Sequence, residues 1–95
     1  MERELEELRR EIDRIDRELV ELFKARMQVC AEVAEYKRVR SLPVLAPDRE
    51  QALLARVSEL AGEELGGYAA EVYRSILSVS RAYQSARLGR GDQTE

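Results

Sequence analysis

Two positively charged side chains fall on the apolar face of a long helix that the sequence predicts. Residues 2–38 contain no Pro or Gly, and their apolar members recur at intervals of three and four, as in one amphipathic helix. Arg26 falls in the middle of that apolar arc, and Lys37 follows eleven residues later, almost three whole turns on, so both share one side of the helix. Burial of an unpaired charge costs several kcal/mol, so the two cations predict a bound counter-charge.

Neutral polar side chains interrupt a second apolar face nearer the C-terminus. Ser80 and Gln84 are four residues apart and therefore neighbours on the helix face that carries Ile76. Arg49 and Glu50 occupy the first turn of another predicted helix, directly after a proline-containing loop. Together these positions offer cations, an amide, a hydroxyl and a single acid. We therefore predict that they line one internal polar pocket.

Such a pocket suits an anionic ligand and catalysis without a nucleophile. Arginine and lysine side chains bind carboxylates and phosphates. The sequence has no His and only one Cys, Cys30, which excludes the usual catalytic triads and any metal site built from Cys and His. We therefore expect no metal and no cofactor, and any chemistry there must depend on positioning and electrostatics.

Each of these residues also has a purely structural alternative. Arg26 could pair with a Glu across a dimer, and Lys37 could extend along its helix to reach water. Ser80 could hydrogen-bond its own helix, and Gln84 could reach solvent. Glu50 could be an acid favoured in a first turn by the helix dipole. A common pocket accounts for all five together, whereas the alternatives need a separate reason for each.

The elements that must position these residues are all helical. We expect helices over residues 2–38, 49–61 and 68–88, a loop over residues 41–48 and a disordered tail over residues 89–95. Asp48 resembles an N-cap, with Gln51 completing a capping box. Gly62, Gly66 and Gly67 predict a turn between the last two helices. The result is one all-α domain, residues 1–88, with three helices.

The first helix is too long for its own chain to cover. At 1.5 Å per residue it would measure about 55 Å, whereas a compact chain of this size has a radius of gyration of about 12–13 Å. Its apolar stripe needs a partner, and a second copy is the simplest one. We therefore predict an intertwined helical homodimer.

Charge and composition exclude several classes of protein. The 16 basic and 19 acidic residues give a net charge of −3, unlike a nucleic-acid binder. No apolar run reaches the roughly 18 residues of a membrane span, and the highly charged N-terminal stretch is not typical of a signal peptide. A lone Cys indicates a reducing compartment, so we expect a cytoplasmic protein.

The polar positions and their surroundings resemble a known family. Over residues 5–88 the chain resembles the all-helical chorismate mutases. Three segments carry the resemblance: LRREIDRIDRELVELFKARMQVCAEVAEYK, DRE after the loop, and VYRSILSVSRAYQ. This resemblance implies the isomerisation of chorismate to prephenate in phenylalanine and tyrosine biosynthesis, with no cofactor. It also implies a dimer of three-helix chains in which the long first helices pair.

The resemblance assigns a role to each polar position. Arg9, from the partner chain, and Arg26 would hold the substrate carboxylates, with Ser80 assisting. Lys37 and Gln84 would be catalytic, donating hydrogen bonds to the ether oxygen whose bond breaks. Since Gln84 is a neutral donor where some relatives carry a Glu that must be protonated, activity should not require acid.

The ring end of the substrate involves three further positions. Glu50 would accept a hydrogen bond from the ring hydroxyl, and Arg49 would support that end of the site. Family members often carry an Asp where this chain has Ala46, but the contact there is made by the main-chain N–H, which Ala46 retains.

Two other functions stay open at this point. The stretch LAPDRE also resembles the loop of isochorismate–pyruvate lyases, which share the fold, but those enzymes usually lack an acid at the position of Glu50. A non-catalytic helical dimer that regulates or binds another protein is the second alternative. The sequence does not settle whether the chain associates with another shikimate-pathway enzyme.

Overall fold

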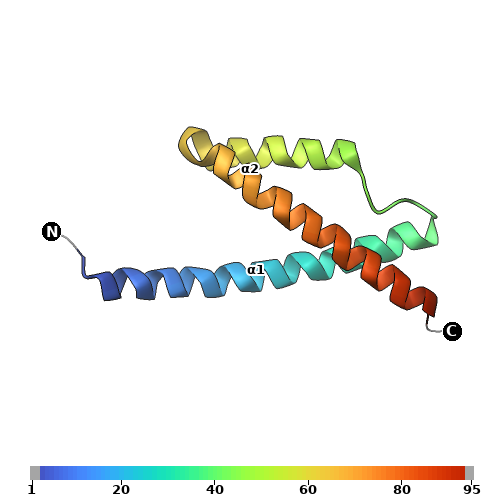
Figure 1. Ribbon diagram of the computed structural model, residues 1–95, viewed down its shortest axis with the longest axis horizontal. Coiled ribbons are helices and arrows are strands. Elements are labelled where there is room, and N and C mark those ends of the chain that lie inside the picture. The colour runs from blue at the N-terminus through green and yellow to red at the C-terminus, as the bar shows by residue number, and fades with distance from the viewer. Residues whose placement is uncertain (1–2, 94–95) are drawn as a thin grey trace.

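The described part of the chain is entirely helical. The computed structural model describes the backbone of residues 3–93 and the side chains as far as residue 88. Within residues 3–93 there is no strand, and two helices are assigned, α1 over Leu5–Val39 and α2 over Pro47–Gln93 (Figure 1). The all-α prediction is therefore confirmed.

The helix count differs from the three predicted helices. Where the sequence predicted two helices, the structure has one, α2. This helix is interrupted at Gly62, whose φ of 89° and ψ of 175° are not helical. At this break the chain reverses direction, and the later part of α2 crosses over the second half of α1 (Figure 1). We call residues 47–61 the first arm of α2 and residues 63–93 its second arm.

The reversal is confined to one residue because glycine adopts a positive φ without steric cost. Gly66 and Gly67, predicted to lie in the turn, are helical. A Cβ on Gly66 would lie 2.7 Å from Ser58 Oγ and 2.8 Å from the Ser58 carbonyl oxygen, whereas a Cβ on Gly67 would meet nothing within 4 Å. Gly66 therefore lets the two arms approach closely just after the break.

Both helices begin with residues suited to an N-terminus. Glu4 and Glu7 form a capping box, so α1 starts at Leu5. The prediction of Asp48 as an N-cap is wrong, because α2 starts one residue earlier, at Pro47. Proline suits the first helical position, where its missing N–H would have no partner anyway, and Asp48 lies in the first turn.

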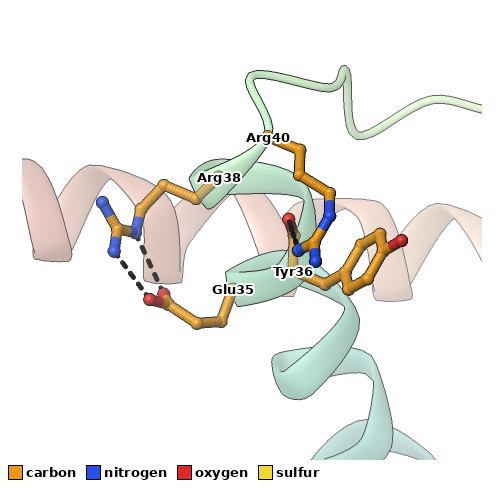
Figure 2. A network of polar contacts seen from close by, with 4 residues as sticks. All are labelled: Glu35, Tyr36, Arg38 and Arg40. Carbon is orange, nitrogen blue, oxygen red and sulfur yellow. Dashed lines mark hydrogen bonds and ion pairs between the residues drawn. The ribbon is translucent and has the colours of Figure 1, made fainter.

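The last turn of α1 is held by paired side chains (Figure 2). Arg38 contacts both carboxylate oxygens of Glu35, at 2.6 and 3.0 Å. The guanidinium of Arg40 stacks on the ring of Tyr36, 3.7 Å from its centre, and donates a hydrogen bond to the Tyr36 carbonyl. The hydrogen bond from Arg38 lowers the pKa of Glu35, so any stability from this exposed pair is present at neutral pH and is lost as the carboxylate protonates in acid.

A single chain encloses little apolar surface. The molecule measures 61 × 29 × 14 Å, and its radius of gyration of 17.2 Å exceeds that of a compact chain of this length. The N-terminal half of α1 extends beyond α2 (Figure 1). The large apolar side chains of that half are exposed by 39% or more: Leu5, Leu8, Ile12, Ile15, Leu19, Val20, Leu22 and Phe23.

Neither α1 nor α2 has, over its described residues, an apolar stretch long enough to cross a membrane. The predicted tail, residues 89–95, falls partly in the last turns of α2 and partly outside the described residues. Its disorder stays a prediction.

Candidate active site

A pocket of about 300 Å³ lies between α1, the loop and both arms of α2. All seven predicted site residues other than Arg9 contribute to its wall. The lining residues are Arg26, Val29, Cys30, Val33, Lys37, Val44, Ala46, Arg49, Glu50, Leu53, Leu77, Ser80, Arg81 and Gln84. The structure therefore brings together the polar side chains of three segments that are far apart in the sequence.

Arg26 is held in the pocket wall by the second arm of α2. Its Nη1 donates a hydrogen bond to Ser80 Oγ at 2.8 Å and lies 3.7 Å from Cys30 Sγ. The guanidinium carbon is 5.9 Å from the centre of the Tyr73 ring. Ser80 is only 3% exposed, and its hydroxyl also contacts Met27 Sδ at 3.8 Å. Ser80 thus orients Arg26 across the helix crossing, and Arg26 keeps further N–H donors for an anion.

Lys37 connects the last turn of α1 to the loop. Its Nζ donates a hydrogen bond to the carbonyl oxygen of Val44 at 2.8 Å, within a partly buried environment. An ammonium group has three donors, so this bond fixes the position of Lys37 and leaves donors for a ligand. This contact differs from the structural alternative, in which Lys37 extends along its helix to reach water.

Gln84 is buried, with a side-chain oxygen that has no partner. It is 7% exposed, and its Oε1 makes no hydrogen bond to any described residue. A buried polar atom left in this state costs about 1–3 kcal/mol. Rotation about the last side-chain bond exchanges the amide oxygen and nitrogen, so Gln84 can present either an acceptor or a donor to a bound molecule. The Gln84 amide therefore lies in the pocket wall with hydrogen-bonding capacity that the described residues do not use.

Glu50 and Arg81 form an ion pair across the two arms of α2. Arg81 Nη1 lies 2.5 Å from Glu50 Oε1, and the side chains are 35% and 21% exposed. Sequence reasoning missed Arg81 as a pocket residue. The spacing that could have found it was present, because residues 77, 80, 81 and 84 follow the pattern of one helix face. Arg49, next to Glu50, is exposed at the edge of the pocket.

Arg9 does not reach the pocket of its own chain. It is exposed on the extended half of α1, seventeen residues before Arg26 and therefore about 25 Å away along the helix. The structure of one chain leaves the site without this residue.

The comparison with protein families settles what kind of domain this is. The family model of chorismate mutase type II matches residues 8–85, which include every residue of the pocket. The chain belongs to the chorismate mutase type II family.

Individual relatives of this chorismate mutase domain are longer proteins or separate enzymes. A bifunctional chorismate mutase/prephenate dehydratase of Aquifex aeolicus is 36% identical, over 79% of this chain and 22% of that protein. The T-protein of Haemophilus influenzae is 38% identical, over 77% of this chain and 19% of that protein. A chorismate mutase of Methanocaldococcus jannaschii is 34% identical, over 62% of this chain and 60% of that protein. The chain thus spans about a fifth of the first two relatives. No solved structure matches it significantly.

The pocket of this chorismate mutase domain is locally positive in an acidic chain. Four basic side chains line it, Arg26, Lys37, Arg49 and Arg81, against the one carboxylate of Glu50, although the whole chain carries a net charge of −3. Among the side chains that the structure describes, no cluster of His, Cys, Asp or Glu could hold a metal ion. A cleft of one charge sign concentrates ligands of the opposite sign, so the pocket is suited to an anion.

Proposed function

We propose that this chain isomerises chorismate to prephenate in the pocket between α1 and α2. The observation that carries the proposal is the convergence of Arg26, Lys37 and Gln84 on one cavity. The reaction is an intramolecular rearrangement in which a C–O bond breaks as a C–C bond forms, so it needs no nucleophile, base or metal. The chain has no histidine to activate Ser80 or Cys30 as a nucleophile, whereas the pocket offers several donors for a dianion. Membership of the family supports the same conclusion.

In this proposal Arg26 binds one carboxylate of the substrate. Ser80 holds the guanidinium in place, since its Oγ already accepts a hydrogen bond from Arg26. The second carboxylate is bound by Arg9 of a partner chain. Two arginines that grip the two carboxylates keep the flexible dianion in its compact reactive conformer, which removes much of the entropic barrier.

Lys37 and Gln84 act on the bond that breaks. Negative charge grows on the ether oxygen in the transition state, and donors aimed there stabilise it more than they stabilise the bound substrate. A rate gain of about 10⁶ corresponds to roughly 8 kcal/mol. Two strong donors act on the ether oxygen: the Lys37 ammonium and the Gln84 amide, turned with its N–H₂ inward. Together with selection of the reactive conformer, they can supply a stabilisation of this size.

The opposite end of the pocket holds the substrate ring. Glu50 accepts a hydrogen bond from the ring hydroxyl, the main-chain N–H of Ala46 donates to it, and Arg49 supports this end. All three residues line the pocket. They hold the ring in place while the C–O bond breaks and the new C–C bond forms on it.

The working enzyme is a homodimer in this proposal. Support comes from the exposed apolar stripe on the N-terminal half of α1 and from the distance of Arg9 from its own pocket. Pairing of two such helices would bury the stripe and bring Arg9 to the other chain. Association with another pathway enzyme is proposed only by analogy with the bifunctional relative, and a cytoplasmic location stays a prediction.

The direct test is to mix the protein with chorismate and follow the loss of its absorbance as prephenate forms. We expect rapid turnover that Arg26→Ala abolishes, and that persists in Arg56→Ala, which removes an exposed arginine outside the pocket. A wild-type protein that leaves chorismate unchanged would overturn the proposal. Release of pyruvate from isochorismate as the dominant reaction would instead identify a lyase.

A further inference from the structure

The ion pair between Arg81 and Glu50 lies at the end of the pocket where we place the substrate ring. The pair joins the first turn of the first arm of α2 to the second arm, at 2.5 Å. Hydrogen bonds between a guanidinium and a carboxylate are among the stronger ones in proteins. Arg81 is therefore the residue that determines where the Glu50 carboxylate points.

One oxygen of Glu50 is engaged by Arg81, and the carboxylate retains a second oxygen for a ligand. A free glutamate side chain has three rotatable bonds and loses their freedom on binding. Since Arg81 already restricts Glu50 in the structure, less freedom remains to be lost when the ring hydroxyl donates to it.

Arg81 also changes the charge that a ligand meets. Without it, Glu50 would be an isolated carboxylate able to attract a cation. With it, the acid is paired, and Arg49 adds a further positive charge nearby. A neutral hydroxyl needs only an acceptor, whereas a protonated amine needs an unpaired negative charge and would be repelled by the two guanidinium groups.

We propose that Arg81 is a positioning and specificity residue, which aims Glu50 at the ring hydroxyl and makes the site prefer a hydroxyl over a protonated amine at that ring position. This inference rests on the proposed chorismate mutase activity. Arg81 acts through Glu50 and does not touch the bond that breaks, so its loss should alter substrate binding and selectivity more than kcat.

The test compares chorismate with its analogue 4-amino-4-deoxychorismate, in which an amino group replaces the ring hydroxyl. In Arg81→Gln we expect the KM for chorismate to rise, with a smaller change in kcat. The preference for chorismate, as a ratio of kcat/KM values, should fall by about tenfold, the size typical for loss of one discriminating contact. Arg81→Lys, which keeps the charge, should restore most of the preference.

Two controls separate this role from a structural one. Arg74→Gln removes an exposed arginine two turns earlier on the same arm, outside the pocket, and should leave the ratio unchanged. In a Glu50→Gln background, Arg81→Gln should change the ratio much less, because the carboxylate that Arg81 pairs and aims is gone and only the repulsion by its own charge remains. Thermal melting of each variant reports any loss of folding.

The outcomes are distinct. If the wild-type protein is active and Arg81→Gln keeps the same preference, this inference alone is overturned. The same holds if Arg81→Gln loses activity on both substrates equally and also loses stability. A wild type with no activity on chorismate overturns the proposed function and this inference with it. The inference is supported if the preference falls in Arg81→Gln, returns in Arg81→Lys, and changes much less when Arg81 is replaced in the Glu50→Gln background.

Discussion

At the scale of the residue, the two polar side chains that are buried in the described part of the chain have different roles. Ser80 is satisfied within the chain, because it accepts a hydrogen bond from Arg26. Gln84 leaves a buried oxygen without a partner. A side chain that contributed only to stability would not be retained with such a penalty. Gln84 is therefore a residue whose replacement should affect turnover without loss of stability.

Replacement of Gln84 by Glu tests its role as a neutral donor. The Gln84 amide has no titratable proton, so we expect kcat/KM of the wild-type protein to be flat between about pH 6 and 8. In Gln84→Glu the introduced carboxyl donates only when protonated. Its activity should be highest in acid and fall about tenfold per pH unit above the pKa of that carboxyl.

The measurement is the pH profile of kcat/KM for both proteins. Gln84→Ala is the matched control, since it removes the donor without adding an acid and should be poorly active at every pH, with unchanged or higher melting temperature. A wild-type rate that drops sharply between pH 6 and 8 would contradict the assignment of Gln84 as the neutral donor.

Residue types and spacing predicted most of the polar side chains that line the pocket. Arg26 and Lys37 interrupt an apolar stripe, and Ser80 and Gln84 interrupt another, so each was visible as a polar side chain where burial was expected. Arg81 was missed because an arginine at the edge of a helix face resembles an ordinary solvent-exposed charge. Only the position of the first arm of α2, which brings Glu50 to it, distinguishes Arg81 from a surface residue.

At the scale of the element, the sequence placed the long first helix within a few residues of its ends. It did not predict that three glycines in six residues would produce a one-residue break. Glycine weakens a helix but does not forbid it, so Gly66 and Gly67 remain helical once packing supports them. The close contact of Gly66 with Ser58 depends on how the two arms meet, and no local pattern predicts that contact.

The two helical glycines offer a matched pair of substitutions. Alanine at Gly67 meets open space in the chain and should stabilise the protein by up to about 1 kcal/mol through helix propensity. Alanine at Gly66 would lie against the Ser58 backbone carbonyl, which cannot rotate away, so we expect destabilisation by about 1–3 kcal/mol as in other overpacked sites. Chemical denaturation of both variants measures the difference, and equal stabilities would contradict the close approach of the two arms.

At the scale of the whole molecule, one chain has a nearly complete pocket and an incomplete core. The pocket is built from α1 and both arms of α2, yet the N-terminal half of α1 exposes most of its apolar side chains. The same half carries Arg9. A second chain placed along it would therefore solve two problems at once, by burying the stripe and by supplying a cation to the pocket. Folding and activity should thus depend on the same association.

Mixing two inactive variants tests this link between assembly and catalysis. In the proposed dimer each site uses Arg26 from one chain and Arg9 from the other. Arg9→Ala and Arg26→Ala should each be nearly inactive alone, because every site of either homodimer lacks one arginine. A mixed dimer has one site with both arginines and one with neither. Random pairing makes about half of the dimers mixed, so unfolding and refolding the two variants together should recover about a quarter of the wild-type activity.

The recovered activity should scale with the fraction of mixed dimers, which native mass spectrometry measures directly. Refolding each variant by itself is the control and should yield no gain. If Arg9 acted within its own chain, a mixed dimer would contain no complete site and the mixture would stay as inactive as its components. The experiment therefore distinguishes a site shared between chains from one that a single chain completes, because only a shared site allows two defective chains to repair each other.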